Sequence, residues 1–310
     1  MLFYLDNWQS VAPPTPEALA KMGARKRFAR GLNENYAREL LELHTLGVDG
    51  GYTQKDIIAV ARCFTGWTIQ RPYQFGGSFE YNDKVHDKGE KVVLGVTIPA
   101  GGGKDDALKV LDILVHHPST ARFISKKLAQ RFVADDPPSA LIDRMAKTFR
   151  EKDGDLREVM RTMLASKEFW SQGAWHAKMK SPLEMIASAI RATGANVESA
   201  SILAGQLQQL GEPLYRKVEP TGYSSANAEW TNSAALLARM NFGLALAQNK
   251  VPGLKVDTSR FEKLSDPQSI ARSVLFTDST AETQAAIAKD SKQPAKVAGL
   301  VIGSPEFQRR

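Results

Sequence analysis

The spacing of apolar residues along the chain predicts a mainly helical protein. In residues 34–46 and 105–116, leucine and valine recur three or four positions apart, which gathers them on one face of a helix. Residues that begin or end helices recur along the chain. They predict helices from Thr53 to about Phe64, from Pro118 through Phe132, up to about Phe149, from Asp155, from Ser181, and near 199–210 and 226–247.

One region departs from this pattern. Residues 67–98 are rich in aromatic residues, glycine and β-branched residues, including Tyr73, Phe75 and the run Lys91-Val92-Val93. This composition predicts a small β-hairpin or irregular insert between helices. The predicted fold is therefore a multi-helix globular array with an insert near residues 67–98. Residues 250–296 are predicted to form loops between short helices.

The composition fits a globular protein with a sizeable core, because 43% of its 310 residues are hydrophobic. The net charge of +7 permits an anionic partner but does not by itself predict one. The single cysteine, Cys63, excludes an intramolecular disulfide and a cysteine-rich zinc site. Because Cys63 lies in a mostly apolar run, we expect a buried thiol.

No segment reaches the roughly 18 apolar residues of a membrane span, and no clear nucleic-acid signal is present. The start, MLFYLDNWQSVAPPTPE, has neither a basic segment nor an apolar stretch of signal-peptide length. As written, the chain is expected to be soluble. Its apolar first residues suggest a missing upstream part, so we expect residues 1–310 to form a single helical domain at the C-terminal end of a longer protein.

The helix at residues 34–46 carries the first set of candidate chemical groups. On a helical wheel, Asn35, Arg38, Glu39 and Glu42 share a polar arc, whereas His44 falls in the apolar arc and is expected to point inward. Metal ligands on one helix must share a face, and neither glutamate shares a face with the histidine. The two glutamates form either a reactive pair or a solvated network with their neighbours.

The second set lies at residues 86–91, HDKGEK. A histidine next to an aspartate on a loop supplies metal ligands or an acid–base pair, although a hairpin turn explains the sequence about equally well. The glycine run at 101–103 does not complete a phosphate loop, because Asp105 stands where serine or threonine is required. The basic residues at 25–30 would either bind an anion or form a solvated face.

The stretch 33–69, NENYARELLELHTLGVDGGYTQKDIIAVARCFTGWTI, resembles the signature of a bacterial family known as domain of unknown function number 1800. Residues 85–103, 117–138, 153–170, 180–195 and 211–223 fit it as well. The resemblance implies a largely helical, often longer protein of the periplasm or cell envelope. It also implies a sulfatase-like exported partner, but it supplies no reaction, metal or cofactor.

The candidate residues fall within these family-like segments, and they support two hypotheses. In the first, the chain is a helical binding or assembly scaffold that acts with an exported partner in the cell envelope. In the second, it is an envelope hydrolase, possibly metal-dependent, with a site formed by the helix 34–46 and the loop 86–91. The assigned roles are catalytic for Glu39, Glu42, His86 and Asp87, binding of an anionic or other ligand for Asn35, Arg38, Trp67 and Lys91, and a structural polar network for Asn33 and His44.

Overall fold

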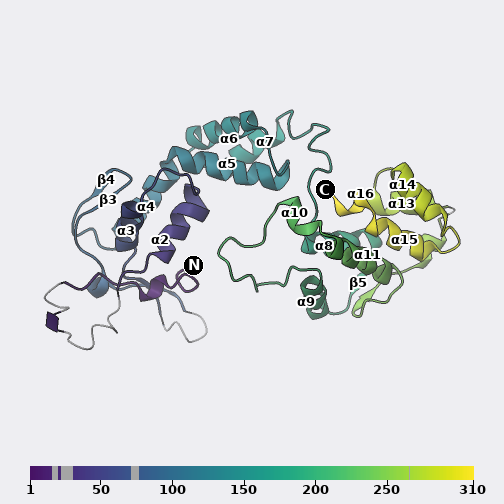
Figure 1. The fold of residues 1–310 in the computed structure, drawn as a ribbon, viewed down its shortest axis with the longest axis horizontal. Coiled ribbons are helices and arrows are strands. Elements are labelled where there is room, and N and C mark those ends of the chain that lie inside the picture. Colours follow the sequence, from purple (N-terminus) through teal and green to yellow (C-terminus); the bar gives the residue numbers. More distant parts are fainter. Residues whose placement is uncertain (16–19, 22–30, 71–76, 265) are drawn as a thin grey trace. The chain divides into compact units, whose positions relative to one another are not determined.

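The computed structural model describes residues 1–15, 20–21, 31–70, 77–264 and 266–310 (Figure 1). The chain is mainly α-helical with a small β insert, which confirms the predicted fold class. It divides into two compact units, Met1–Lys127 with Ile142–Met163 (unit 1) and Leu128–Leu141 with Leu164–Arg310 (unit 2). The single domain stays a prediction, because this division does not show whether either unit folds alone.

Unit 1 contains the helices predicted near residues 34–46, 53–64 and 105–116, and two short 3₁₀-helices, η1 (Asn7–Gln9) and η4 (Asp83–Val85), that the sequence did not predict. The predicted helices are α2 (Asn35–Glu39) with η3 (Leu40–Thr45), α3 (Gln54–Cys63) and α4 (Asp105–His116). Helices α5 (Pro118–Phe132) and α6 (Ser139–Glu151) cross the division between the units, and α7 (Leu156–Leu164) ends at it. Helix α3 begins at a capping box, in which Thr53 and Asp56 satisfy each other's backbone N–H groups.

The insert consists of two antiparallel hairpins, as predicted. Strand β1 (Trp67–Ile69) pairs with β2 (Phe79–Tyr81), and β3 (Lys91–Val93) pairs with β4 (Val96–Ile98). The second hairpin turns through Leu94 and Gly95, which both have positive φ, the backbone conformation that two-residue hairpin loops favour. Tyr73 and Phe75 of the predicted insert, and the basic residues at 25–30, lie outside the described residues.

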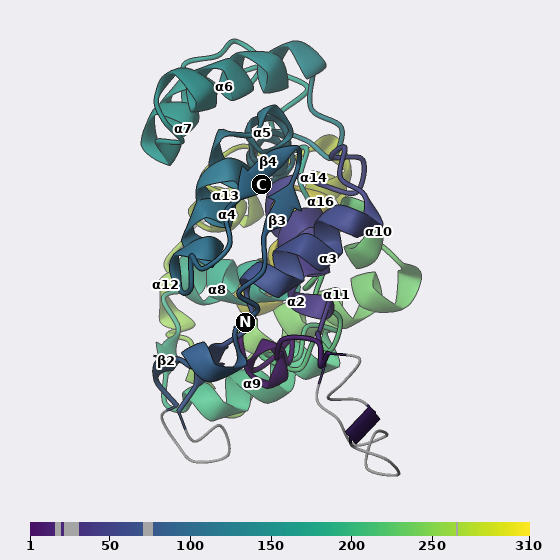
Figure 2. The same cartoon turned by 90° about the vertical axis from the view of Figure 1, so that its left-hand side faces the viewer.

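The core of unit 1 forms around α3, which lies beside β3 (Figures 1 and 2). Ile57 and Val60 of this helix, and Phe64 just after it, are buried against residues of the π-helix, the hairpin and α4. Cys63 is also buried, and burial raises the pKa of its thiol to about 12. The prediction of a buried thiol is confirmed.

The prediction that His44 points inward is wrong, because His44 is exposed. The segment Leu40–Thr45 is a π-helix, in which the Leu46 N–H donates to the Leu41 carbonyl five residues earlier, at 2.8 Å. A π-helix has more residues per turn than the 3.6 assumed for the helical wheel. The positions after Leu40 are therefore rotated, and His44 moves from the apolar arc to the surface.

Unit 2 is built from short helices. They are α8 (Pro182–Thr193), α9 (Ala200–Gln209), α10 (Asn227–Trp230), α11 (Ser233–Ala247), α12 (Ser259–Glu262), α13 (Pro267–Leu275), α14 (Ala281–Ala288), α15 (Pro294–Gly303) and α16 (Pro305–Gln308). Strands β5 (Asn196–Val197) and β6 (Leu254–Lys255) form a third antiparallel pair. Loops separate the short helices of residues 250–296, as predicted.

Helix α15 lies at the centre of this unit, where Val297, Val301 and Ile302 are buried. Helix α11 approaches it closely, since a Cβ added to Gly243 would stand 2.9 Å from the Gly299 carbonyl oxygen. Two glycines thus permit backbone contact between the helices. Among the described residues, no helix combines the length and apolar composition that crossing a bilayer requires.

Candidate functional site

Polar side chains from α3, the loop after it, the insert and α4 meet inside unit 1 and form what we call the buried polar network. Its members are Arg62, Thr65, His86, Asp87, Lys91 and Asp106. Three of these, His86, Asp87 and Lys91, are residues that the sequence singled out. The structure therefore brings together the candidates of the loop 86–91, and it adds three residues that the sequence did not indicate.

Asp106 is the centre of the network. Its Oδ2 accepts a hydrogen bond from the Lys91 ammonium group at 2.6 Å and lies 3.2 Å from Nε2 of His86. The side chains of Lys91 and Asp106 are both 0% exposed. A buried carboxylate requires a close compensating charge, and the ammonium group of Lys91 provides it. Lys91 also donates to the Asp87 carbonyl oxygen.

The hydrogen-bond partner of the His86 Nδ1 atom shows that this atom is a donor. Its Nδ1 is 2.8 Å from the Thr65 carbonyl oxygen, which can only accept, so Nδ1 carries a proton and donates. On the other side, Nε2 faces the Asp106 carboxyl group.

Asp87 is held by a two-pronged contact with Arg62. The Arg62 Nε and Nη2 atoms donate to the two carboxylate oxygens at 2.7 Å and 3.0 Å, and the Gly89 N–H donates at 2.9 Å. Burial alone would raise the pKa of Asp87, but the Arg62 and Gly89 hydrogen bonds lower it overall. Asp87 is therefore an ionised group whose acceptor sites are already used.

The glycine run before α4 explains how Asp106 fits. A Cβ added to Gly102 would stand 1.9 Å from Oδ1 of Asp106, so only glycine leaves room for the carboxylate. In the part of the chain that the structure describes, this buried Oδ1 atom has no hydrogen-bond partner. Three glycines, separated by Lys104 from an acidic pair, were thus the available sequence signal for Asp106. Arg62 and Thr65 flank the buried Cys63 and Phe64, and nothing local marks them.

The polar residues of helix α2 form a separate set at the surface of unit 1. Arg38 donates to the Gln54 side-chain oxygen at 3.0 Å, and Gln54 donates to Glu34 at 2.6 Å. Asn33 donates to the Asp6 carbonyl oxygen at 3.2 Å and accepts from the Asn35 N–H at 2.8 Å. Asn33 is therefore part of a structural polar network that joins α2 to the first residues of the chain.

The two glutamates proposed as catalytic residues lie in different surroundings from the loop residues. Glu42 accepts a long hydrogen bond, 3.4 Å, from the Tyr52 hydroxyl group. Over the described ranges, no hydrogen bond or ion pair joins Glu39 or Glu42 to His86 or Asp87. Nor do those ranges contain three or more histidine, cysteine or acidic side chains arranged to hold a metal ion.

Trp67, a predicted binding residue, packs between Phe64 and Phe79 at ring-centroid distances of 5.3 Å and 5.0 Å. Its indole N–H donates to the Lys104 carbonyl oxygen at 3.4 Å. The ring therefore joins α3 to the first hairpin. Trp67 is thus engaged in packing, and Lys91 is buried. Of the four predicted binding residues, Asn35 and Arg38 therefore lie nearest the solvent.

Unit 2 has an aromatic pocket that the sequence did not indicate. It has a volume of about 410 Å³ and is lined by Phe132, Phe169, Trp170, Ser171, Ala174, Trp175, His176 and Arg310. Trp170 and Trp175 are 76% and 71% exposed, which is unusual for tryptophan. Two tryptophans five residues apart in the sequence are compatible with a buried core as well as with an exposed pocket, so the sequence did not mark this pocket.

Comparison with known proteins gives one match. A family model described as "Protein of unknown function (DUF1800)" matches residues 1–309. No curated protein and no solved structure matches the chain.

Proposed function

We propose that this chain, which belongs to the DUF1800 family of proteins of unknown function, is a helical binding and assembly protein that acts with an exported partner in the cell envelope. The observation that carries the proposal is the internal pairing of the buried polar network. Lys91 and Arg62 are used by Asp106 and Asp87, so their charges hold the insert against α3 and α4. These residues then stabilise the fold, and their charges are not available to bind a substrate.

We assign partner contact to the aromatic pocket of unit 2. Tryptophan and arginine are enriched among the residues that dominate binding energy at protein interfaces. Trp170, Trp175 and Arg310 supply both types within one pocket. The indole N–H of Trp170 donates to the Leu164 carbonyl oxygen at 2.7 Å, which holds the ring in place while leaving most of its surface exposed. The partner we propose is the sulfatase-like exported protein that the family resemblance implies.

The test is the affinity of the purified chain for the purified sulfatase-like partner, measured by sedimentation or interferometry. Replacing Trp170 and Trp175 together by alanine should weaken binding by roughly 30-fold or more, because a hot-spot residue is worth about 2 kcal/mol or more. Tyr215→Ala is the matched control, since it removes a fully exposed aromatic side chain of unit 2 outside the pocket. Equal affinities of the two variants would refute the assignment.

The alternative is an envelope hydrolase, with or without a metal ion, whose site would be formed by the helix 34–46 and the loop 86–91. The observation that favours it is the 3.2 Å contact between His86 Nε2 and Asp106 Oδ2, next to an Oδ1 atom that has no hydrogen-bond partner among the described residues. Elemental analysis of the purified protein and its His86→Asn variant separates the readings. Stoichiometric metal that is lost with His86 would favour the hydrolase, whereas partner binding that survives in His86→Asn would favour the scaffold.

A further inference from the structure

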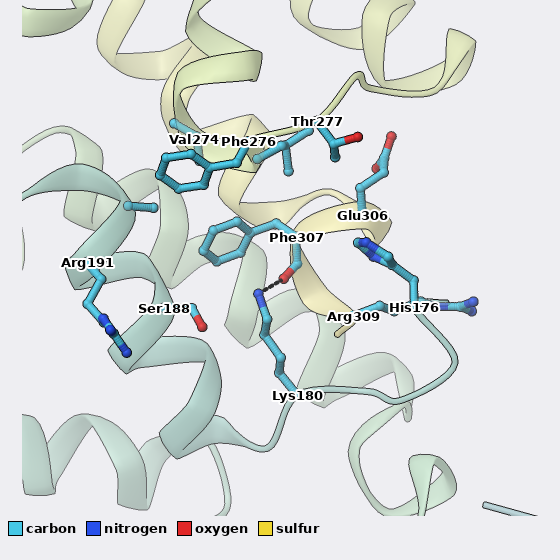
Figure 3. Close-up of a pocket in the computed structure, with 12 residues that line it drawn as sticks. His176, Lys180, Ser188, Arg191, Val274, Phe276, Thr277, Glu306, Phe307 and Arg309 are labelled. Atoms are coloured by element: carbon cyan, nitrogen blue, oxygen red, sulfur yellow. Dashed lines mark hydrogen bonds between the residues drawn. The ribbon is translucent and has the colours of Figure 1, made fainter. Parts of the chain in front are cut away.

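A cavity in unit 2 gathers lysine and arginine side chains that form no ion pair with a described residue. It has a volume of about 500 Å³ and is lined by residues of α8, α13 and α16 and by residues of the segment 176–180 (Figure 3). Its basic residues are His176, Lys180, Arg191 and Arg309, and its acidic residue is Glu306. Figure 3 shows Lys180 in the middle, with Ser188 and Arg191 on one side and Arg309, His176 and Glu306 on the other.

Lys180 is held in place from both ends. Its backbone N–H donates to the Gln308 carbonyl oxygen at 2.9 Å, beside the bridge between Met179 and Arg309. Its ammonium group donates to the Phe307 carbonyl oxygen at 2.6 Å and lies 4.1 Å from the centre of the Phe307 ring. An ammonium group has three N–H donors. Over the described residues the Phe307 carbonyl is its one hydrogen-bond acceptor, which leaves two donors for a ligand.

Lys180 forms no ion pair with a described residue. Burial lowers the pKa of Lys180 to about 8, with Glu184 acting to raise it and Arg310 to lower it. The Glu184 carboxylate is already shared by Arg131 at 2.5 Å and Arg310 at 3.2 Å. A partly desolvated cation without its own counterion is costly, and an anion in the cavity would remove that cost.

The acidic residue of the cavity is also engaged elsewhere. Glu306 accepts hydrogen bonds from the Thr280 N–H at 2.7 Å and the Thr283 hydroxyl group at 2.9 Å. Burial alone would raise its pKa, but the hydrogen bonds from Thr280 and Thr283 lower it to about 2. Arg191 and Arg309 are exposed, and neither forms an ion pair with any described residue. Three permanent or readily formed cations therefore face one occupied carboxylate.

We propose that this cavity binds an oxyanion, a phosphate, sulfate or carboxylate group, with Lys180 as the central donor and Arg191 and Arg309 at the sides. Such groups match the donors of lysine and arginine side chains. The cavity volume lies in the range of small-molecule sites, so it accommodates a ligand larger than an inorganic ion. The cavity shares His176 with the aromatic pocket, but its central donor, Lys180, lies outside that pocket and outside the buried polar network.

Binding of inorganic sulfate and of glucose 6-phosphate, measured by calorimetry at pH 7 and constant ionic strength, tests the proposal. Both probes should bind saturably at one site. Lys180→Gln should weaken binding at least tenfold, since it removes the central charge and two donors. Lys289→Gln, which removes an exposed lysine of the same unit outside the cavity, should change it less than twofold.

A second variant covers the case in which Lys180→Gln disturbs folding. Arg191→Gln changes an exposed side chain without hydrogen bonds to described residues, and it should weaken binding about fivefold. Tighter binding of the sugar phosphate than of sulfate would support an organic ligand, and equal binding would support an inorganic one. The proposal is overturned if neither probe saturates, or if Lys289→Gln matches the two cavity variants.

Discussion

Replacing Lys91 by methionine should destabilise unit 1 strongly. The substitution keeps the length and much of the volume of the side chain but removes the ammonium group that lies 2.6 Å from Asp106. The Asp106 carboxylate then stays buried with His86 as its one remaining contact, while its Oδ1 atom already lacks a hydrogen-bond partner among the described residues. An uncompensated buried charge of this kind costs about 3–5 kcal/mol.

Cys63 offers a direct assay for this loss. It is the only cysteine of the chain, and its side chain is buried in the core of unit 1. A thiol reagent therefore reacts with Cys63 only when unit 1 opens, and the rate reports the opening equilibrium. A loss of about 3–5 kcal/mol corresponds to a rate increase of roughly 100- to 4,000-fold, since each 1.4 kcal/mol is a factor of ten.

The matched control is Lys88→Met. Lys88 also lies 2.6 Å from a carboxylate, that of Asp83, but the two side chains are 61% and 56% exposed. Solvent screens exposed ion pairs, so they contribute little to stability and the rate should rise by less than about fivefold. The double variant Lys91→Met/Asp106→Asn should recover more than half of the lost stability, because no uncompensated charge remains. If Cys63 reacts no faster in Lys91→Met than in Lys88→Met, the burial of an ion pair does not determine how much stability its loss removes.

Two further predictions concern the glycine run and the oxyanion cavity. Gly102→Ala should lower the thermal unfolding temperature by several degrees, because its Cβ would stand 1.9 Å from Asp106 Oδ1, whereas Gly31→Ala, with open space around it, should change it little. Sulfate affinity should fall about tenfold from pH 7 to pH 9. Lys180 has a pKa of about 8, so it is charged below that pH and neutral above it, whereas sulfate does not titrate in this range. The Lys180→Gln variant should show no such fall. The other charged or titratable groups around Lys180 are His176, Glu184, Arg191, Glu306, Arg309 and Arg310.

The helices of this chain follow from local information, which is why the sequence predicts most of them. Thr53 with Asp56, and Ser181 with Glu184, form capping boxes three residues apart, and both are present in the structure. Each device satisfies N–H groups at a helix start with side chains of the same segment, so no distant partner is needed. The insert near residues 67–98 is predictable for a similar reason, because its hairpins join neighbouring strands.

The wrong prediction for His44 shows what the local sequence does not determine. The helical wheel assumes 3.6 residues per turn, and nothing in the sequence of residues 40–45 announces a π-helix. The candidate site shows the same limit in another form. Lys91 and His86 lie 15 and 20 residues from Asp106 in the sequence. Tertiary packing brings them together, so the sequence revealed the clustered loop residues and missed the acid that they surround.

Two lysines of this chain differ in whether a carboxylate within the fold pairs with their charge, and this difference distinguishes a structural role from a ligand-binding role. Lys91 is buried with its countercharge, Asp106, inside the protein, so the ion pair holds the insert to α4. Lys180 is partly buried, yet it contacts a carbonyl oxygen and an aromatic ring and forms no ion pair with a described residue. A desolvated cation without an internal countercharge works against the folded state and favours an external anion. The sequence singled out Lys91 as a ligand-binding residue, but its countercharge lies within the fold. By the same criterion, Lys180 is a lysine whose charge an external anion would compensate, which is the basis of the proposed oxyanion site.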